Sequence, residues 1–510
     1  MTASNSAAGS GLTSTRESLF VACCVSLIVT AMSFAIRGAL IGPLSDQFGL
    51  DKAQIGWIVG TAFWGFTLAI VIGGPLCDTV GMGRLLALAF VGHTVGIFMT
   101  IFATGFWTLF FSTLAFGMGN GFVEAACNPL IATLYPDEKI KRLNRFHMWF
   151  PGGIVIGGLA SYFIAQSGIG GVKITGHNWQ IQMASMLIPL VIYGFLFIGK
   201  KFPATERVAS GVSTGDMWKE CLRPFFLIFL VCMLLTAATE LGTGQWIPNI
   251  LTITTGASGI LLLVWQNGLM AVGRGFAGPI VHRLSPVAVL LGSATFSAIG
   301  LYLLSQARTP IQGWGAITVF AVGVCFFWPT MLGTVSERFP RTGSLGLALM
   351  GGAGMLASNF AQPVIGTKYD DITAQTAQAS VAKPAIAQQL QSLSMQALPA
   401  GAGEDDQKAL KSYQGAYAKA KGQTDAATQS GLLAAAAKTP GASDAIKSEA
   451  NAALAEGGSA GLQTIVILPI ILIFAFGGIF LYDRSRGGYK KETLGETALE
   501  NAEMSPAHQA

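Results

Sequence analysis

The chain contains twelve apolar stretches, each long enough to cross a lipid bilayer as a helix. A helix rises about 1.5 Å per residue, so about 20 apolar residues span the hydrocarbon core of a membrane. The stretches lie at residues 18–44, 53–77, 84–104, 107–135, 146–166, 179–199, 224–252, 259–281, 285–305, 312–335, 343–367 and 461–482. Only 11% of the 510 residues are charged, and the mean hydropathy is +0.55. The sequence therefore predicts an all-α membrane protein rather than a soluble one.

Lysine and arginine residues concentrate in alternate loops, including 139–145, 200–223 and 484–491. Basic loops stay on the cytoplasmic side of a membrane, so this bias predicts the orientation. We expect a multi-pass protein of the cell membrane (inner or plasma) with both termini in the cytoplasm. The net charge of +5 does not indicate a nucleic-acid partner, because the basic residues fall in these loops.

The spacing of the stretches predicts the division of the chain. We expect a cytoplasmic N-terminal tail (1–17), a six-helix bundle (18–199), a cytoplasmic linker (200–222), a second six-helix bundle (223–367 and 460–483), an external insertion (368–459) and a cytoplasmic tail (484–510). The insertion, between helices 11 and 12, has a low-complexity composition. It predicts a solvated segment, partly helical and partly disordered. We interpret it as a tolerated insertion, with a lid or a docking segment as the alternative.

One acidic residue, Glu124, lies about halfway along the fourth stretch. A carboxylate in the centre of a membrane costs about 2.5–3.5 kcal/mol on insertion scales, so such a group faces a water-filled cavity or pairs with another group. We interpret Glu124 as part of a substrate or ion site, with a packing acid bound to a neighbouring helix as the alternative. Asn128 follows one turn later, before Pro129, where the helical hydrogen-bond pattern opens.

The second half also carries polar residues inside its apolar stretches. They are Glu240, Gln245, Trp246 and Asn249 in the seventh stretch, and Gln266 and Asn267 in the eighth. Amide groups and an indole face suit a sugar, whose hydroxyls donate and accept hydrogen bonds and whose C–H face stacks on aromatic rings. Hydrogen bonds between helices would explain the same residues. His93 and His147 could relay protons, but lone histidines more often bond a neighbour, so they are left out of the predicted site.

A short turn joins the second and third stretches, with the sequence GPLCDTVGMGR from Gly74 to Arg84. Asp78 ends one helix and Arg84 opens the next. We predict that the two form a charged latch at the cytoplasmic face, because ion pairs that break and reform suit a gate between two conformations.

This turn closely resembles the signature loop of the major facilitator superfamily, and GRGFAG at Gly273–Gly278 is similar to a degenerate second copy. The resemblance implies twelve transmembrane helices in two pseudo-symmetric six-helix bundles. Three segments resemble the fucose–galactose–glucose:proton symporter branch more specifically: EAACNP from Glu124, ELGTGQW from Glu240 and FPATER from Phe202. That likeness would make Glu124 the protonatable coupling residue and the polar group of helix 7 part of a sugar site.

Helix 1 departs from that branch, which typically has an Asn/Asp pair where this chain has Arg37. The function predicted is a secondary active transporter that imports a sugar-like solute with a proton or sodium ion. The substrate-binding residues predicted are Arg37, Asn128, Glu240, Gln245, Trp246, Asn249, Gln266 and Asn267. We expect no enzymatic activity, cofactor or metal site, and a monomer in the bilayer. The alternatives are a carrier of an anionic solute that binds Arg37, and a membrane sensor that does not transport.

Overall fold

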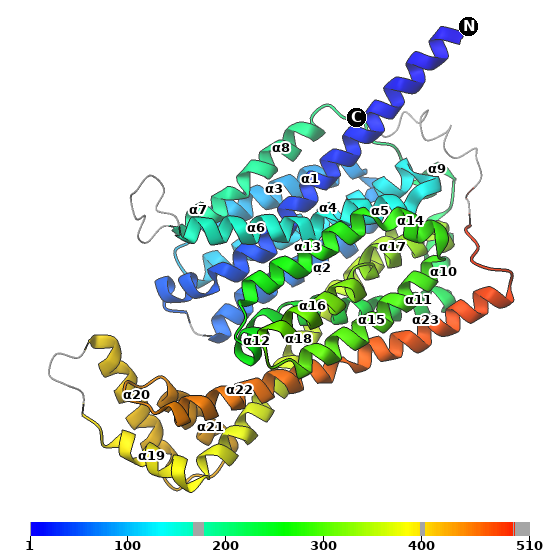
Figure 1. Ribbon diagram of the computed structural model, residues 1–510. Helices are drawn as coiled ribbons and strands as arrows, with labels where there is room; N and C mark the ends of the chain where they lie inside the picture. The colour runs from blue at the N-terminus through cyan, green and yellow to red at the C-terminus, as the bar shows by residue number, and fades with distance from the viewer. Residues whose placement is uncertain (1, 51, 167–177, 398–402, 493, 495–510) are drawn as a thin grey trace.

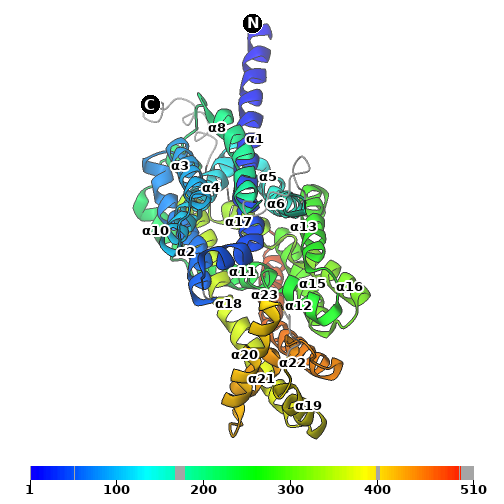
Figure 2. The ribbon, with the colours of Figure 1, turned by 90° about the vertical axis from the view of Figure 1, so that its left-hand side faces the viewer.

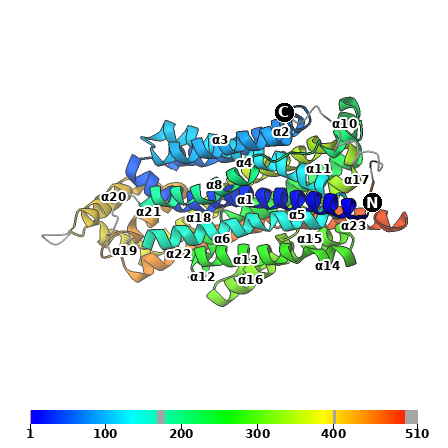
Figure 3. The same ribbon diagram turned by 90° about the horizontal axis from the view of Figure 1, so that it is seen from above.

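The computed structural model describes residues 2–50, 52–166, 178–397, 403–492 and 494 of the chain. Within these residues the chain forms helices and no strand, which confirms the all-α class. Most of the helices run side by side along one direction (Figures 1 and 3). The short helices α9 (Glu206–Ala209) and α10 (Thr214–Cys221) lie at one end of this bundle, called here the linker end. The opposite end, which carries residues 368–459, is called the insertion end.

The first half of the bundle contains the helices before the linker. They are α1 (Thr2–Phe48), α2 (Lys52–Thr79), α3 (Met82–Ile101), α4 (Phe106–Leu134), α5 (Lys139–His147), α6 (Trp149–Gln166), α7 (Asn178–Ser185) and α8 (Leu187–Phe197). The predicted tail at 1–17 is helical from Thr2 and continues into the first span. Short breaks at Met148 and Met186 divide the fifth and sixth predicted spans into two helices each.

The second half repeats this plan with more interruptions. It contains α11 (Pro224–Ala237), a π-helical turn (Ala238–Gly242), α12 (Ile247–Thr255), α13 (Gly259–Gly275), α14 (Ala277–Arg283), α15 (Pro286–Gln306), α16 (Pro310–Val324), α17 (Phe327–Arg338), α18 (Gly343–Val381), α22 (Asp444–Ile465) and α23 (Ile467–Ser485). A π-helical turn inside an α-helix often marks a functional position.

Ten helical segments of the described chain are long and apolar enough to cross a membrane. Two predicted spans fall outside this set: 146–166, where α6 has 18 residues, and 259–281, where the break at Phe276 leaves α13 with 17. These two helices pack on each other within the bundle. Glycines allow some helices to pack closely: a Cβ at Gly117 of α4 would overlap the carbonyl oxygen of Ala62 in α2.

The insertion forms a small helical lobe that projects beyond the bundle (Figures 1 and 2). Helices α18 and α22 extend into it, and α19 (Pro384–Ser394), α20 (Glu404–Ala420) and α21 (Ala426–Ala437) complete it. The described residues of the insertion are mostly helical, so the expectation of partial disorder does not hold for them. Residues 398–402 of the insertion and 495–510 of the predicted C-terminal tail lie outside the described residues. The few large apolar residues recur at helical spacing and form a separate core that includes Ile386, Leu390, Leu410, Tyr413, Leu433 and Ile446.

Candidate functional site

Glu124 belongs to a buried polar network at the centre of the first half. Asn128, one turn further along α4, donates a hydrogen bond from Nδ2 to Glu124 Oε2 at 2.6 Å. His147, the last residue of α5, places Nε2 3.0 Å from Asn128 Oδ1 and 3.8 Å from Glu124 Oε2. The side chain of Glu124 is 2% exposed and that of His147 is 1% exposed. The predicted pair of Glu124 and Asn128 therefore lies together, and His147 joins it.

Pro129 explains a neighbouring contact of this network. Proline has no N–H, so it cannot donate to the carbonyl four residues earlier. The carbonyl of Ala125 is left without its helical donor, and Cys77 of α2 donates to it from Sγ at 3.1 Å. A proline inside α4 thus fixes the contact between α4 and α2 beside Glu124.

Arg274 is the centre of the corresponding network in the second half. Its side chain is 1% exposed, and Nη2 donates to Glu240 Oε1 at 2.7 Å. Glu240 lies in the π-helical turn Ala238–Gly242. The neighbouring Gly273 lets α13 approach Cys325 closely, since a Cβ there would overlap the thiol. A buried arginine and a buried carboxylate therefore neutralise each other inside the bundle.

The other two contacts of Arg274 follow from two further prolines. Its Nε donates to the carbonyl of Cys325 at 2.6 Å, and its Nη1 donates to the carbonyl of His147 at 3.2 Å. Cys325 is four residues before Pro329, and His147 is four residues before Pro151. Both carbonyls lack their helical donor for that reason. Because His147 belongs to the first half, Arg274 connects the two halves and links the Glu240 pair to the Glu124 network.

Several predicted substrate-binding residues keep polar atoms without a partner. Within the described chain, no hydrogen-bond partner is found for three buried nitrogens of Arg37, for Glu240 Oε2, for Trp246 Nε1 or for Gln266 Oε1. The guanidinium carbon of Arg37 lies 4.8 Å from the centre of the Phe116 ring. Buried polar groups are normally hydrogen-bonded, so these atoms are open positions for a ligand or for water.

The remaining predicted substrate-binding residues lie elsewhere. Asn267 donates from Nδ2 to the carbonyl of Leu263 in its own helix at 2.9 Å. Gln245 and Asn249 have exposed side chains. The structure therefore does not join these three residues to the buried networks.

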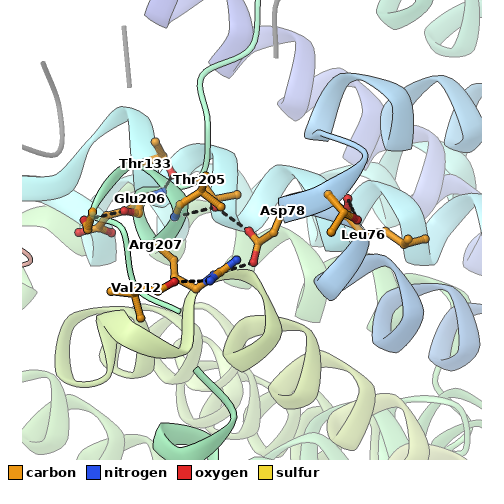
Figure 4. Close-up of polar contacts among 10 residues, drawn as sticks. Leu76, Asp78, Thr133, Thr205, Glu206, Arg207 and Val212 are labelled. Carbon is orange, nitrogen blue, oxygen red and sulfur yellow. Dashed lines mark hydrogen bonds and ion pairs between the residues drawn. The ribbon is translucent and has the colours of Figure 1, made fainter. Parts of the chain in front are cut away.

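Asp78 pairs with an arginine of the linker at the linker end of the bundle. Arg207 Nε donates to Asp78 Oδ2 at 2.8 Å, and Thr205 Oγ1 donates to Asp78 Oδ1 at 2.6 Å (Figure 4). Arg207 also donates from Nη1 to the carbonyl of Val212 at 2.5 Å. Arg84, the partner predicted from the sequence, is exposed and donates to the carbonyl of Val80 at 3.4 Å. The ion pair at Asp78 thus uses a residue 129 positions away instead of one in the same turn.

The linker segment also connects the two halves. Lys139 of α5 forms an ion pair with Glu206 at 2.6 Å and donates to the carbonyl of Ser336 in α17 at 3.4 Å. The backbone N–H of Glu206 donates to Thr133 of α4 at 3.2 Å (Figure 4). The side chain of Arg207 lies against Gly343, whose φ of +53° favours glycine. These contacts hold the linker end closed in this structure.

Sequence reasoning missed three of the residues that make these contacts: His147, Arg207 and Arg274. Arg274 lies inside the eighth apolar stretch, where an ionisable residue is as unusual as Glu124 is in the fourth. From the sequence alone, Arg274 is assigned only to the second copy of the signature loop. The prolines four residues after each carbonyl acceptor were a second signal, but only the folded chain shows which side chain fills those positions.

Comparisons with known proteins agree with this architecture. The family model described as Major Facilitator Superfamily matches residues 22–362. The gentisate transporter of Corynebacterium glutamicum is 22% identical over 356 residues, which cover 67% of this chain and 78% of that protein. The human sodium-dependent glucose transporter 1 is 23% identical over 439 residues, 77% of this chain and 83% of that protein. The solved structure of the Escherichia coli fucose:proton symporter is similar in fold, with a TM-score of 0.57 at 15% identity, covering 68% of this chain and 91% of that one.

Proposed function

This chain belongs to the major facilitator superfamily, and on that premise we propose that it is a secondary active transporter. It imports a small hydroxylated, sugar-like solute by alternating access between two half-bundles, and a proton gradient drives the import. In this proposal the linker end faces the cytoplasm and the insertion end faces outward. The positive charge of the loops at the linker end supports that orientation.

The environment of Glu124 carries the proposal of proton coupling. Among the ion pairs of the described residues, Glu124 has no lysine or arginine partner; its neighbours are the amide of Asn128 and the imidazole of His147. Proton uptake by Glu124 removes a charge from the membrane interior without leaving a fixed cation unpaired. Glu240 differs, because its protonation would strand Arg274. Glu124 is therefore the better proton carrier of the two buried acids.

The contacts at the linker end supply the second element of alternating access. Opening this end requires the halves to separate, which breaks the bond from Lys139 to Ser336 and moves Arg207 away from Gly343. We propose that the Asp78–Arg207 and Lys139–Glu206 pairs hold the linker segment in the closed arrangement. Both pairs can reform, as a gate that opens in every cycle requires.

The second candidate function is transport of an anion. The unpartnered nitrogens of Arg37 favour it, since a buried cation without a counter-ion is costly. Relatives support both candidates by name, one as a gentisate transporter and one as a sodium-dependent glucose transporter.

Proton coupling is tested with the purified protein in proteoliposomes. A thermal-shift screen of neutral sugars and sugar acids first supplies a solute that binds, and counterflow by the unmodified protein then shows that it is transported. We expect Glu124→Gln to exchange the labelled probe in counterflow but not to accumulate it on a pH gradient. Glu456→Gln, which lies at the insertion end and pairs with Arg308, is the matched control and should retain both activities. Accumulation by Glu124→Gln on a pH gradient would refute the proton-coupling role.

A further inference from the structure

The unpartnered buried atoms lie at similar depths in the two halves. Arg37 contacts Phe116, which is eight residues from Glu124 along α4 toward the insertion end. Gln266 is likewise eight residues from Arg274 along α13 toward the same end. At the helical rise, eight residues correspond to about 12 Å. Arg37 and Gln266 therefore lie at a similar height on opposite halves, above the Glu124 and Arg274 networks.

Two more open atoms belong to this region of the second half. Trp246 Nε1 has no partner among the residues described, and Trp246 is six residues from Glu240 along the same span, again toward the insertion end. Its ring centre lies 6.1 Å from that of Tyr369 of α18. Glu240 leaves Oε2 open while Oε1 is bound to Arg274. The region thus extends from Glu240 upward to Gln266 and Trp246.

The open atoms of the two halves require different ligand groups. A guanidinium is a donor only, and its planar fork matches the two oxygens of a carboxylate. Gln266 Oε1 and Glu240 Oε2 are acceptors and require donors, which the hydroxyl groups of a neutral surface provide. The indole N–H of Trp246 donates to an acceptor, which a hydroxyl oxygen can be. A carboxylate placed against Glu240 would be repelled, so the anion belongs on the side of Arg37.

The contact of Arg37 with Phe116 is a weak one for a buried cation. A cation over an aromatic face gains about 0.5–2 kcal/mol, less than a buried cation gains from a paired carboxylate. The contact therefore holds the guanidinium in place without satisfying its hydrogen bonds. A carboxylate can displace it from the ring and supply the bonds that are missing.

We propose that the transported solute is a hydroxylated carboxylate, with its carboxylate on Arg37 and its hydroxyl groups on Glu240, Trp246 and Gln266. The inference rests on the proposed transport function and names its substrate class. It also combines the two candidate substrates, because one solute can bind the Arg37 guanidinium with its carboxylate and donate to Glu240 and Gln266 with its hydroxyl groups. A neutral sugar lacks the carboxylate, and a simple carboxylate lacks the hydroxyl groups.

Binding to the purified full-length protein in detergent tests this by calorimetry, with two matched series of probes. The first contains D-galacturonate, D-galactose without the carboxylate, and cyclohexanecarboxylate without the hydroxyls. The second contains 2,5-dihydroxybenzoate, hydroquinone and benzoate. We expect the bifunctional member of at least one series to bind about tenfold or more tightly than both of its partners.

Two variants assign the two ends of the ligand, and a third is their control. Arg37→Gln should weaken the bifunctional probe about 10- to 100-fold and leave its uncharged partner unchanged. Gln266→Leu should weaken the bifunctional probe about three- to tenfold and leave the hydroxyl-free acid unchanged. Arg308→Gln, which removes an arginine that pairs with Glu456 at the insertion end, is the control and should change neither. If Arg37→Gln does not fold, the Gln266 variant still tests the hydroxyl end.

The proposal is overturned if, in both series, the bifunctional probe binds no better than its partners, the absence of any binding included. It is also overturned if Arg37→Gln weakens the acid and the neutral partner equally. The binding assay does not involve proton movement. Tight binding of a hydroxy acid combined with pH-driven accumulation by Glu124→Gln would therefore reject proton coupling and retain the substrate class.

Discussion

At the scale of single residues, three prolines determine which side chains meet at the centre of this protein. Pro129, Pro151 and Pro329 each leave a backbone carbonyl without its helical donor. Cys77 donates to the first of these carbonyls, and Arg274 donates to the other two. The guanidinium of Arg274 forms an ion pair with Glu240, and its other two hydrogen bonds go to the backbone carbonyls of Cys325 and His147. These carbonyls are free to accept because a proline interrupts the helical hydrogen-bond pattern.

The pairing of Arg274 with Glu240 leads to a prediction about stability. Arg274→Gln leaves a carboxylate buried without its cation, which costs about 3–5 kcal/mol. Adding Glu240→Gln removes that charge, so the double variant should unfold at a higher temperature than Arg274→Gln alone. Thermal unfolding in detergent measures this. A double variant less stable than the single one would show that Glu240 is held by other groups.

The partner of Asp78 leads to a prediction about transport rate. Asp78→Asn and Arg207→Gln should each slow turnover and leave solute affinity within a few-fold, because the pair acts on the conformational change. The double variant should be no slower than either single one, since both remove the same contact. Initial rates of counterflow against solute concentration provide both values. The matched control is Arg84→Gln, which should leave turnover unchanged. If Arg84→Gln slows turnover as much as Arg207→Gln does, Arg84 takes part in the gate.

At the scale of helices, glycines determine how closely the halves approach. Gly74 of α2 lies against Ala348 of α18, where an added Cβ would overlap the alanine methyl group. Gly351 and Gly352 of α18 lie in the same way against Ile70 and Val71. These helices belong to different halves, so this glycine-lined contact exists only while the linker end is closed.

Enlarging Gly74 should therefore favour the open linker end. Gly74→Val should increase the labelling of a Leu347→Cys probe by a maleimide, because Leu347 lines the small cavity between the halves there. Gly60→Val is the control on the same helix, where an added Cβ meets nothing within 4 Å. Equal labelling in the two variants would contradict the role of the Gly74 contact.

The lobe is a second feature at the scale of helices. It has a separate hydrophobic core and joins the bundle through α18 and α22, which pack closely where Gly457 meets Thr373. Replacing residues 383–443 by a Gly/Ser linker keeps this helix pair and removes the rest. We expect counterflow to be retained, with the unmodified chain at equal membrane level as reference. Loss of counterflow at normal membrane levels would indicate a lid.

At the scale of the whole molecule, the lobe and the linker lie at opposite ends of the bundle (Figures 1 and 3). All spans must then cross one membrane, and the two ends must face different compartments. The contacts of the linker hold both half-bundles against each other at the linker end.

This arrangement predicts the topology. Reporter fusions at Gly211 in the linker and Gln388 in the lobe should report opposite compartments, with Gly211 in the cytoplasm because basic loops remain there. A cytosolic and an exported reporter at each position provide the internal control. The sequence predicts five spans between the two positions, at 224–252, 259–281, 285–305, 312–335 and 343–367. Because five is odd, finding both positions in the same compartment would exclude the twelve-span arrangement.

The sequence by itself determined the properties of each span that depend on nearby residues. Apolar length indicated the helices, basic loops indicated an orientation, and the spacing of Glu124 and Asn128 placed them one turn apart on α4. The same local reasoning chose Arg84 for Asp78 because the two are close in the chain. Tertiary structure decided otherwise, since Arg207 reaches Asp78 only after the linker folds back against the first half. It also decided the place of Arg274, whose acceptors come from three other segments. Local patterns are set by helix geometry, whereas a buried charge is satisfied by whichever groups the packing of distant helices brings within reach.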